Sequence, residues 1–138
     1  MYQTPTNHVD ATHSVVISLA SNRFQKQNLF KARECLGQVL SSLIFSDELW
    51  TKPIGNQRTD MYLNQLAIGT TTLQLDQLNS QLKAIETDFG RNENKRALNI
   101  VPIDLDVMSY DGIRYHLRDW ERPYMQLFNE FLSVHQVI

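Results

Sequence analysis

Residues 71–90 read TTLQLDQLNSQLKAIETDFG and contain the clearest element of the chain. Their large apolar residues recur every three or four positions, at Leu75, Leu78, Leu82, Ile85 and Phe89. This spacing places all five on one face of a helix. Thr71 and Gln74 form a capping-box pair at its start, and Gly90 is the residue type that commonly follows a helix C-terminus. We therefore expect a helix over residues 74–89 with one buried stripe.

Strand patterns lie on both sides of this helix. Residues 102–108 alternate apolar and polar side chains after Pro102, which suits a strand entry or an edge. Residues 60–70 form a second strand pattern, and one face of it carries Tyr62, Asn64, Leu66 and Ile68. Each pattern has the period of two that is typical of strands.

The N-terminal part repeats this organisation. Residues 15–19 are a short β-branched run typical of a buried strand. Apolar residues at helical spacing then predict a helix over about 23–40, which Ser21 or Asn22 could cap. Residues 42–50 alternate as a half-buried strand, with one face formed by Leu43, Phe45 and Leu49 and the other by Ser42, Ser46 and Glu48.

The remaining segments complete the topology. Residues 52–56 and 91–99 are predicted loops. A last amphipathic segment predicts a helix with Pro123 in its first turn and an apolar face of Trp120, Tyr124, Leu127, Phe128, Phe131 and Leu132. The order β-α-β-β-α-β with an added C-terminal helix predicts an α+β, ferredoxin-like antiparallel sheet of four strands with its two main helices on one face.

Composition limits the class of protein. The 138 residues fit one domain, over 13–138, after a loose polar arm over 1–12. The net charge of −2 gives no global attraction for nucleic acid or an anionic membrane, so we expect neither as a partner. Cys35 is the only cysteine, which excludes an intrachain disulfide and a cysteine-based zinc site. With no signal-peptide or membrane-span pattern, we expect a cytoplasmic protein.

The sharpest chemical signal is the pair Asp104 and Asp106. Residues two apart on a strand point to the same side, so two carboxylates stand about 7 Å apart. Such a pair suits Mg²⁺, which binds one or two carboxylates together with phosphate oxygens. The alternative is a solvent-facing strand with two ordinary acidic residues.

Two weaker signals accompany this pair. Arg91, Lys95 and Arg96 place three cations on the predicted loop before the Asp104 strand, where they could neutralise phosphates or form a solvated loop. Tyr62 and Asn64 share a strand face and could hold a flat heterocycle, or belong to the core. The chain contains no HExxH, GxSxG, P-loop or Rossmann motif.

Taken in order, five segments resemble the 6-hydroxymethyl-7,8-dihydropterin pyrophosphokinases. The resemblance covers about residues 13–128, and its segments are Leu19-Ala20-Ser21-Asn22, Thr51-Lys52-Pro53-Ile54-Gly55, Tyr62-Leu63-Asn64, Glu86 to Gly90-Arg91, and Asp104-Leu105-Asp106-Val107-Met108. It implies ATP-dependent transfer of pyrophosphate to the hydroxymethyl group of the pterin, a step of folate biosynthesis, by a Mg²⁺-dependent enzyme whose partners are ATP and the pterin.

The resemblance also implies residue roles. Asp104 and Asp106 would bind two Mg²⁺ ions between ATP and the pterin hydroxymethyl, with Arg91 as a catalytic arginine near the phosphates. The pterin pocket would be formed by Thr51, Ile54, Tyr62, Asn64 and Tyr124, with the Tyr124 ring stacked on the pterin. The ATP side would include Glu86, Lys95, Arg96 and Arg122.

The sequence also departs from the family pattern. Val101 stands where the family has an arginine, Leu98 replaces a tryptophan, and the downstream Pro-His segment is missing, with His116 a candidate substitute. Two alternatives therefore stay open. The chain could be a catalytically degenerate homologue that binds a pterin-like or nucleotide ligand, or a non-enzymatic interaction module. The oligomeric state is also open.

Overall fold

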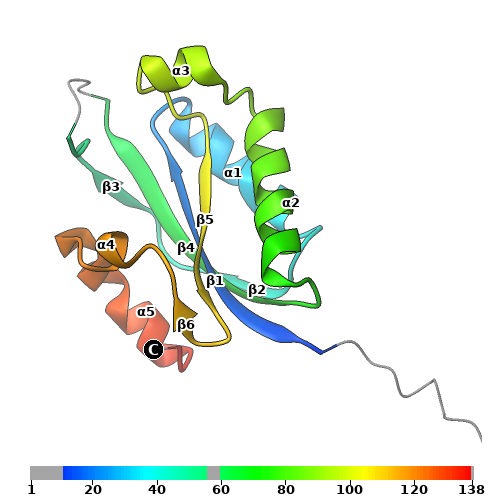
Figure 1. The fold of residues 1–138 in the computed structure, drawn as a ribbon. Helices are drawn as coiled ribbons and strands as arrows, with labels where there is room; N and C mark the ends of the chain where they lie inside the picture. The colour runs from blue at the N-terminus through cyan, green and yellow to red at the C-terminus, as the bar shows by residue number, and fades with distance from the viewer. Residues whose placement is uncertain (1–10, 56–59, 138) are drawn as a thin grey trace, which may run out of the picture.

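The computed structural model describes residues 11–55 and 60–137, so most of the arm predicted over 1–12 lies outside the described residues. Figure 1 shows the chain path. The elements are β1 (His13–Ser21), α1 (Gln25–Leu36), β2 (Ser41–Phe45), β3 (Leu49–Thr51), β4 (Tyr62–Thr71), α2 (Leu75–Asp88), α3 (Glu93–Ala97), β5 (Asp104–Tyr110), β6 (Ile113–Arg114), α4 (Leu117–Trp120), the 3₁₀ helix η2 (Pro123–Phe128) and α5 (Asn129–Val134).

One antiparallel sheet contains every described strand. Its order is β2-β4-β1-β5-β6, and β3 also pairs with β4. The central strand β1 therefore lies between β4 and β5, as a ferredoxin-like sheet requires, and the predicted α+β class is confirmed. The sheet has six strands where the sequence predicted four, because residues 42–50 form two strands and the short β6 adds an edge.

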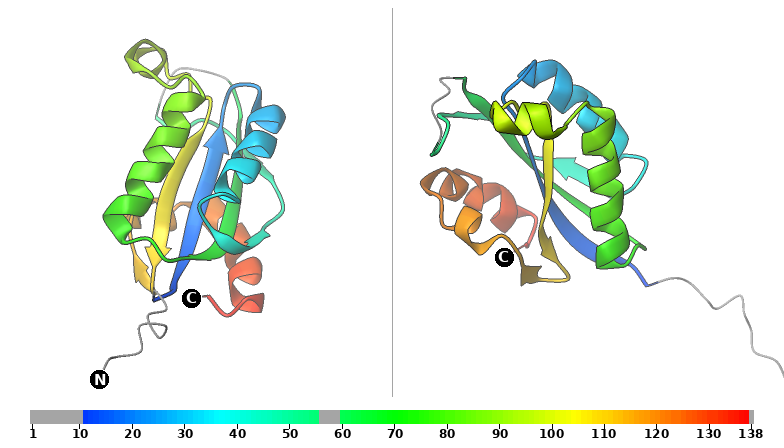
Figure 2. Two further views of the ribbon diagram at one scale, coloured as in Figure 1. Left: turned by 90° about the vertical axis from the view of Figure 1, so that its right-hand side faces the viewer. Right: turned by 45° about the horizontal axis from the view of Figure 1, so that its top comes forward.

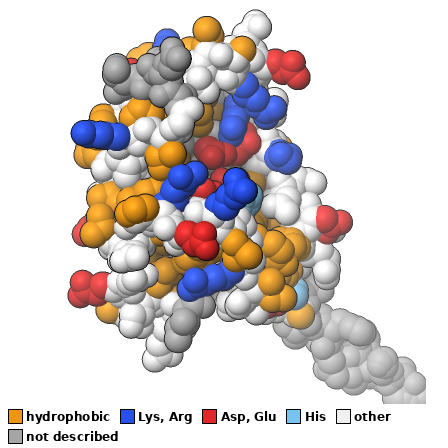
Figure 3. Space-filling view, turned by 60° about the vertical axis from the view of Figure 1, so that its left-hand side comes forward, with side chains coloured by type: hydrophobic (Ala, Val, Ile, Leu, Met, Phe, Trp, Pro, Cys, Tyr) orange, Lys and Arg blue, Asp and Glu red, His pale blue; other side chains and the backbone are white. Residues whose placement is uncertain are grey.

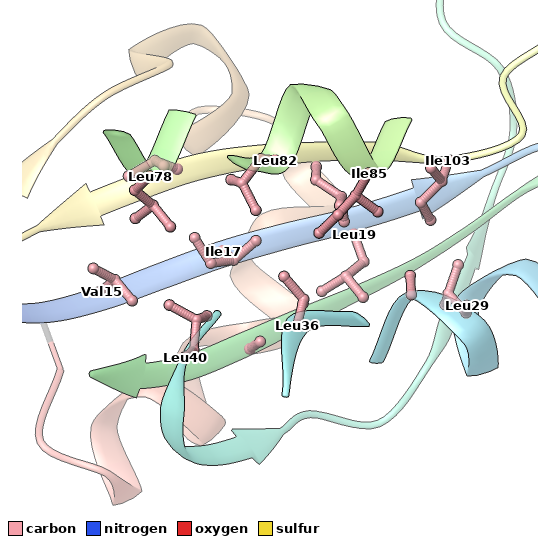
Figure 4. Packing of buried hydrophobic residues seen from close by; sticks show 14 of the residues in the cluster. Val15, Ile17, Leu19, Leu29, Leu36, Leu40, Leu78, Leu82, Ile85 and Ile103 are labelled. Atoms are coloured by element: carbon pink, nitrogen blue, oxygen red, sulfur yellow. The ribbon is translucent and has the colours of Figure 1, made fainter. Parts of the chain in front are cut away.

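Helices α1 and α2 cover one face of the sheet (Figures 1 and 2). Leu78, Leu82 and Ile85 of the predicted stripe are buried, while Leu75 and Phe89 lie partly buried at its ends. Figure 4 shows how these side chains meet β1 and α1, through Val15, Ile17, Leu19, Leu29 and Leu36. The helix predicted over 74–89 and its packing are thus confirmed.

The C-terminal segment covers the opposite face. Met125, Phe128 and Leu132 pack there against Val16, Leu66 and Met108, one residue from each of β1, β4 and β5. Both faces of the central strands are therefore buried over much of their length. The same face also contains the cleft described below.

The predicted strand over residues 42–50 is interrupted at Ser46. Its backbone N–H donates to the Leu66 carbonyl, and its Oγ accepts from the Leu66 N–H, so Ser46 is buried instead of facing solvent. The interruption resets the alternation of side chains. Leu49 consequently packs with the C-terminal cluster, whereas Leu43 and Phe45 pack on the α1–α2 side, so their predicted common face is wrong.

Helix boundaries differ from the predicted ones at three places. α1 ends at Leu36, not at 40, and neither Ser21 nor Asn22 caps it, since the N-cap position belongs to Phe24. α2 is capped by Gln74 with Gln77, three residues after the predicted start of its capping box. The predicted loop over 91–99 contains α3, whose N-cap Asn92 accepts from the Lys95 N–H.

The C-terminal segment is three short helices instead of one. Pro123 begins a 3₁₀ helix, whose three residues per turn shift the helical phase relative to an α-helix. Leu127, predicted on the apolar face, is consequently 68% exposed, and Met125 is buried in its place.

Candidate functional site

A cleft opens on the sheet face that carries the C-terminal segment, and small residues of β1 form its floor. Ala20 pairs with Asn64 of β4 on one side and with Asp104 of β5 on the other. Ser18 likewise lies between Leu66 and Asp106. Short side chains on the middle strand and larger ones on both neighbouring strands produce a depression across three strands. Figure 3 shows this side of the molecule, with acidic side chains set among basic ones.

Most of the predicted ligand-binding residues line this one cleft. They are Thr51, Ile54, Tyr62, Asn64, Asp104, Asp106, Arg122 and Tyr124. They come from β3 and its following loop, from β4, from β5 and from the C-terminal segment. The fold therefore brings together the residues expected on the pterin and those expected on the metal.

The Asn64 amide is held in a fixed orientation. Its Nδ2 donates to the Thr51 Oγ1 at 2.8 Å and to the Leu49 carbonyl at 3.1 Å. Because a carbonyl can only accept, this contact also identifies which end of the amide is the nitrogen. The Asn64 Oδ1 is then the atom that can accept a hydrogen bond from a ligand N–H.

Asp104 and Asp106 lie on the cleft side of β5, since Leu105 and Val107 between and after them belong to the core. The predicted common face of the two carboxylates is thereby confirmed. Burial and the neighbouring charge of Asp104 raise the pKa of Asp106 to about 7. A carboxyl that resists ionisation in this way would be stabilised as an anion by a nearby cation.

Behind the cleft, Arg91 joins two acidic residues. Its Nη1 lies 2.8 Å from Asp104 Oδ1 and 3.3 Å from Glu86 Oε1, and the Glu86 Oε2 accepts from the Leu105 N–H. Burial raises the pKa of Glu86. Burial alone would lower the pKa of Arg91, but the hydrogen bond to Asp104 and the charges of Asp104, Glu86 and Asp106 together outweigh it, so the net change is upward. Arg91 therefore stays charged and holds Asp104 from behind.

The end of α2 explains why Arg91 reaches this place. Gly90 has φ of +87°, its N–H donates to the Thr87 carbonyl, and the Arg91 N–H donates to the Glu86 carbonyl. These two bonds form a Schellman motif, which turns the chain back over the last helical turn. Arg91 and Glu86 are thus neighbours because of the backbone at Gly90.

The other predicted cations occupy different positions. The Lys95 Nζ donates to the Gly90 carbonyl at 2.7 Å, so this lysine closes the turn. Arg96 is exposed on α3 and does not line the cleft. Val101, at the position where the family has an arginine, lies beside the end of β1, because its N–H donates to Asn22 Oδ1. Among the described residues, the cations that line the cleft are Lys52 and Arg122.

His116 and Asp119 lie beside Asp106. The His116 Nε2 is 3.7 Å from Asp106 Oδ1, and the Asp119 carboxylate lies 3.7 Å from the Arg122 Nε. Sequence reasoning considered His116 but missed Asp119. Asp119 lies thirteen positions after Asp106, and no spacing pattern connects a strand residue with a residue of a later short helix.

The donor set of the cleft fits a hard divalent cation. Asp104 and Asp106 offer carboxylate oxygens, the ligand type that Mg²⁺ prefers. Repulsion by the Asp104 charge contributes to the raised pKa of Asp106, and a bound cation would offset that repulsion. Arg91 already neutralises part of the Asp104 charge, so a bound cation would stabilise the Asp106 anion more than the Asp104 anion.

The fold and the cleft define the class: a ferredoxin-like α+β domain whose sheet carries a carboxylate-lined binding site. Residues 16–134 match the sequence profile of 7,8-dihydro-6-hydroxymethylpterin-pyrophosphokinase (HPPK). Because the match spans most of the chain, the protein belongs to this family, as the sequence motifs predicted. The family transfers pyrophosphate from ATP to hydroxymethyldihydropterin in folate synthesis and generally uses Mg²⁺.

Two similar proteins come from Arabidopsis thaliana. One is a folate synthesis bifunctional protein, 32% identical in a 121-residue alignment that covers 80% of this chain and 25% of the relative. The other is a mitochondrial folate synthesis bifunctional protein, 34% identical in a 125-residue alignment that covers 82% of this chain and 22% of the relative. The chain thus spans about a quarter of the length of these relatives. In the part of the chain that the structure describes, no helix is long and apolar enough to cross a membrane.

Proposed function

We propose that this chain transfers pyrophosphate from ATP to the hydroxymethyl group of 6-hydroxymethyl-7,8-dihydropterin. One observation carries the proposal: Asp104 and Asp106 open onto the same cleft as Tyr62, Asn64 and Tyr124. A transfer between two bound molecules requires both in one place, with the reacting groups held in line. Family membership supports the same reaction.

The chain's own groups would position the pterin. Asn64 Oδ1 would accept an N–H of the heterocycle, because the Asn64 Nδ2 is already bonded to Thr51 and Leu49. Tyr124, which lines the cleft from the C-terminal segment, would stack on the ring. Ala20 leaves room for a flat ligand between Asn64 and Asp104.

Asp104 and Asp106 would hold Mg²⁺, which when bound supplies positive charge to the phosphate oxygens. Arg91 orients the Asp104 carboxylate, since its Nη1 lies 2.8 Å from Asp104 Oδ1. Lys52 and Arg122 line the cleft and would add counter-charge for the triphosphate.

The direct test is AMP formation from ATP and hydroxymethyl-dihydropterin in the presence of Mg²⁺. We expect turnover by the parent protein, and a loss of about 10³-fold in Asp104→Asn and in Asp106→Asn, because positioning and charge neutralisation supply most of this catalysis. Asp47→Asn, an exposed carboxylate outside the cleft, is the control. A folded parent protein that forms no AMP would contradict the proposal.

A second candidate is a ligand-binding homologue without catalysis, and the positions of the cations favour it. Arg91 is engaged by Asp104 and Glu86, Lys95 by the Gly90 carbonyl, and Val101 supplies no charge. In a working enzyme, at least one of Lys95 and Arg96 would have to move over the phosphates when ATP binds. Replacing both with alanine should then lower turnover by orders of magnitude and change pterin binding little. Pterin binding without AMP formation, unrescued by Val101→Arg, would support the second candidate.

A further inference from the structure

Asp106, His116 and Asp119 form a cluster of one nitrogen donor and two oxygen donors at the rim of the cleft. Each residue contributes one potential ligand atom, and these three atoms lie within 4.8 Å of one another. Asp106 belongs to β5, while the other two belong to the segment at α4. Two distant parts of the sequence therefore converge on one point in space.

Backbone and side-chain hydrogen bonds hold this arrangement. The Met108 carbonyl accepts from both the Tyr115 N–H and the Trp120 Nε1, which fastens the segment 115–120 to β5 two residues after Asp106. The Arg114 guanidinium lies 4.0 Å from the Trp120 ring centroid and covers that anchor. His116 and Asp119 are three residues apart at the start of α4, with the Asp119 N–H bonded to the His116 carbonyl, so they share a side.

We propose that Asp106, His116 and Asp119 bind a first-row transition-metal cation of the Zn²⁺ or Co²⁺ type. An imidazole ligand favours these cations over Mg²⁺, which prefers oxygen ligands alone. Ligand atoms around such an ion lie about 3.4 Å apart, given metal–ligand distances of about 2.0–2.2 Å. The three side chains need only small rotations to reach this geometry.

The neighbouring contacts permit these rotations. His116 and Asp119 are 45% and 41% exposed at their side chains, so neither is locked by packing. The Asp119–Arg122 contact, at 3.7 Å on the surface, is of a kind that contributes little stability and can be exchanged for a metal bond. The site shares Asp106 with the proposed magnesium site but does not rest on the proposed function.

The test uses the full chain after chelator treatment, without nucleotide or pterin. Co²⁺ is titrated by visible absorption and Zn²⁺ by calorimetry. We expect one equivalent to bind, and both His116→Ala and Asp119→Asn to weaken binding by at least about tenfold. His135→Ala, which changes a histidine just after the end of α5 and outside the cluster, should bind as the parent does. Circular dichroism confirms that each variant is folded.

Two results would overturn the inference: a parent protein that binds neither cation at millimolar concentration, or a folded His116→Ala variant that binds as tightly as the parent. Asp104→Asn separates this site from the proposed function. That variant should lose Mg²⁺–nucleotide binding yet retain Co²⁺, because Asp104 contributes no ligand to the cluster.

Discussion

Asp106 is the residue on which the electrostatics of the cleft converge. Burial withdraws water from its carboxylate and Asp104 repels the charge from two positions away, while His116, 3.7 Å from Asp106 Oδ1, acts in the opposite direction. The resulting pKa of about 7, against an ordinary value of 3.8, makes its ionisation costly in the folded state.

This raised pKa predicts a pH dependence of stability in the metal-free protein. Between about pH 4 and pH 7, folded Asp106 keeps a proton that the unfolded chain has lost, so the free energy of unfolding falls as pH rises and levels off above 7. Asp106→Asn should remove about 1–2 kcal/mol of that fall, after allowance for solvent screening. Urea unfolding from pH 4 to 8 in EDTA measures it, and Asp47→Asn should follow the parent curve. Parallel curves for parent and Asp106→Asn would contradict the assignment.

Arg91 is the cation that pairs with Glu86 and Asp104, and removing its side chain should lower the free energy of unfolding. Arg91→Ala would leave Glu86 and Asp104 without their shared partner, and breaking such a partly buried network costs about 2–3 kcal/mol. Arg96→Ala, on exposed α3, should change the free energy of unfolding by less than about 0.5 kcal/mol. Equal unfolding midpoints for the two variants in urea would show that Arg91 has no structural role.

Single residues also show how far sequence reasoning reaches. Asp104 and Asp106 could be predicted because a strand places alternate residues on one side, and this rule needs no knowledge of other elements. The Arg91 contact with Asp104 depends on where α2 ends, and Asp119 depends on how the segment after β6 folds back onto β5. Neither position follows from local spacing.

At the scale of elements, the turn after α2 connects a helix end to the cleft. Gly90 adopts φ of +87°, and a Cβ there would lie 2.8 Å from the Lys95 Nζ. Gly112 in the β5–β6 turn has a similar φ of +83° but open space around it. Substituting Gly112 therefore tests backbone strain alone, whereas substituting Gly90 tests backbone strain together with a clash against the Lys95 side chain.

We expect Gly112→Ala to cost about 1 kcal/mol through backbone strain alone. Gly90→Ala should cost more, about 2 kcal/mol, because it also displaces Lys95 from the Gly90 carbonyl. Thermal unfolding of both variants measures the difference. In a Lys95→Ala background, the two glycine substitutions should destabilise the protein by nearly the same amount. Equal destabilisation by Gly90→Ala and Gly112→Ala in the parent protein would contradict the role of Lys95.

Elements differ in how well their sequences predict them. α2 keeps one helical period over fourteen residues, so its buried stripe could be read directly. The C-terminal segment has apolar residues at helical spacing as well, but Pro123 introduces a 3₁₀ helix and the period changes within it. Residues 42–50 show the same limit for strands, because Ser46 bonds to Leu66 and resets the alternation.

At the scale of the whole molecule, the core depends on β5. A fragment of residues 1–97 would lack Ile103, Leu105 and Val107 and would leave β1 as an edge strand. We expect this fragment to show no cooperative urea transition and to bind a hydrophobic dye, because it lacks β5 and the C-terminal segment that covers the opposite face of the sheet. A chain lacking only residues 1–10 keeps all described strands and helices and should unfold cooperatively. Cooperative unfolding of the 1–97 fragment would contradict this dependence.

The central place of β1 also has a consequence during synthesis. β1 leaves the ribosome first, yet its partner β5 begins at Asp104, which is 83 residues after Ser21 (104 minus 21). At about 5–20 residues per second, roughly 4–17 s pass before that partner exists. During this time the run Val15-Val16-Ile17 remains an incompletely paired, aggregation-prone segment. A nascent chain of this protein therefore offers chaperones an extended apolar binding segment until translation passes β5.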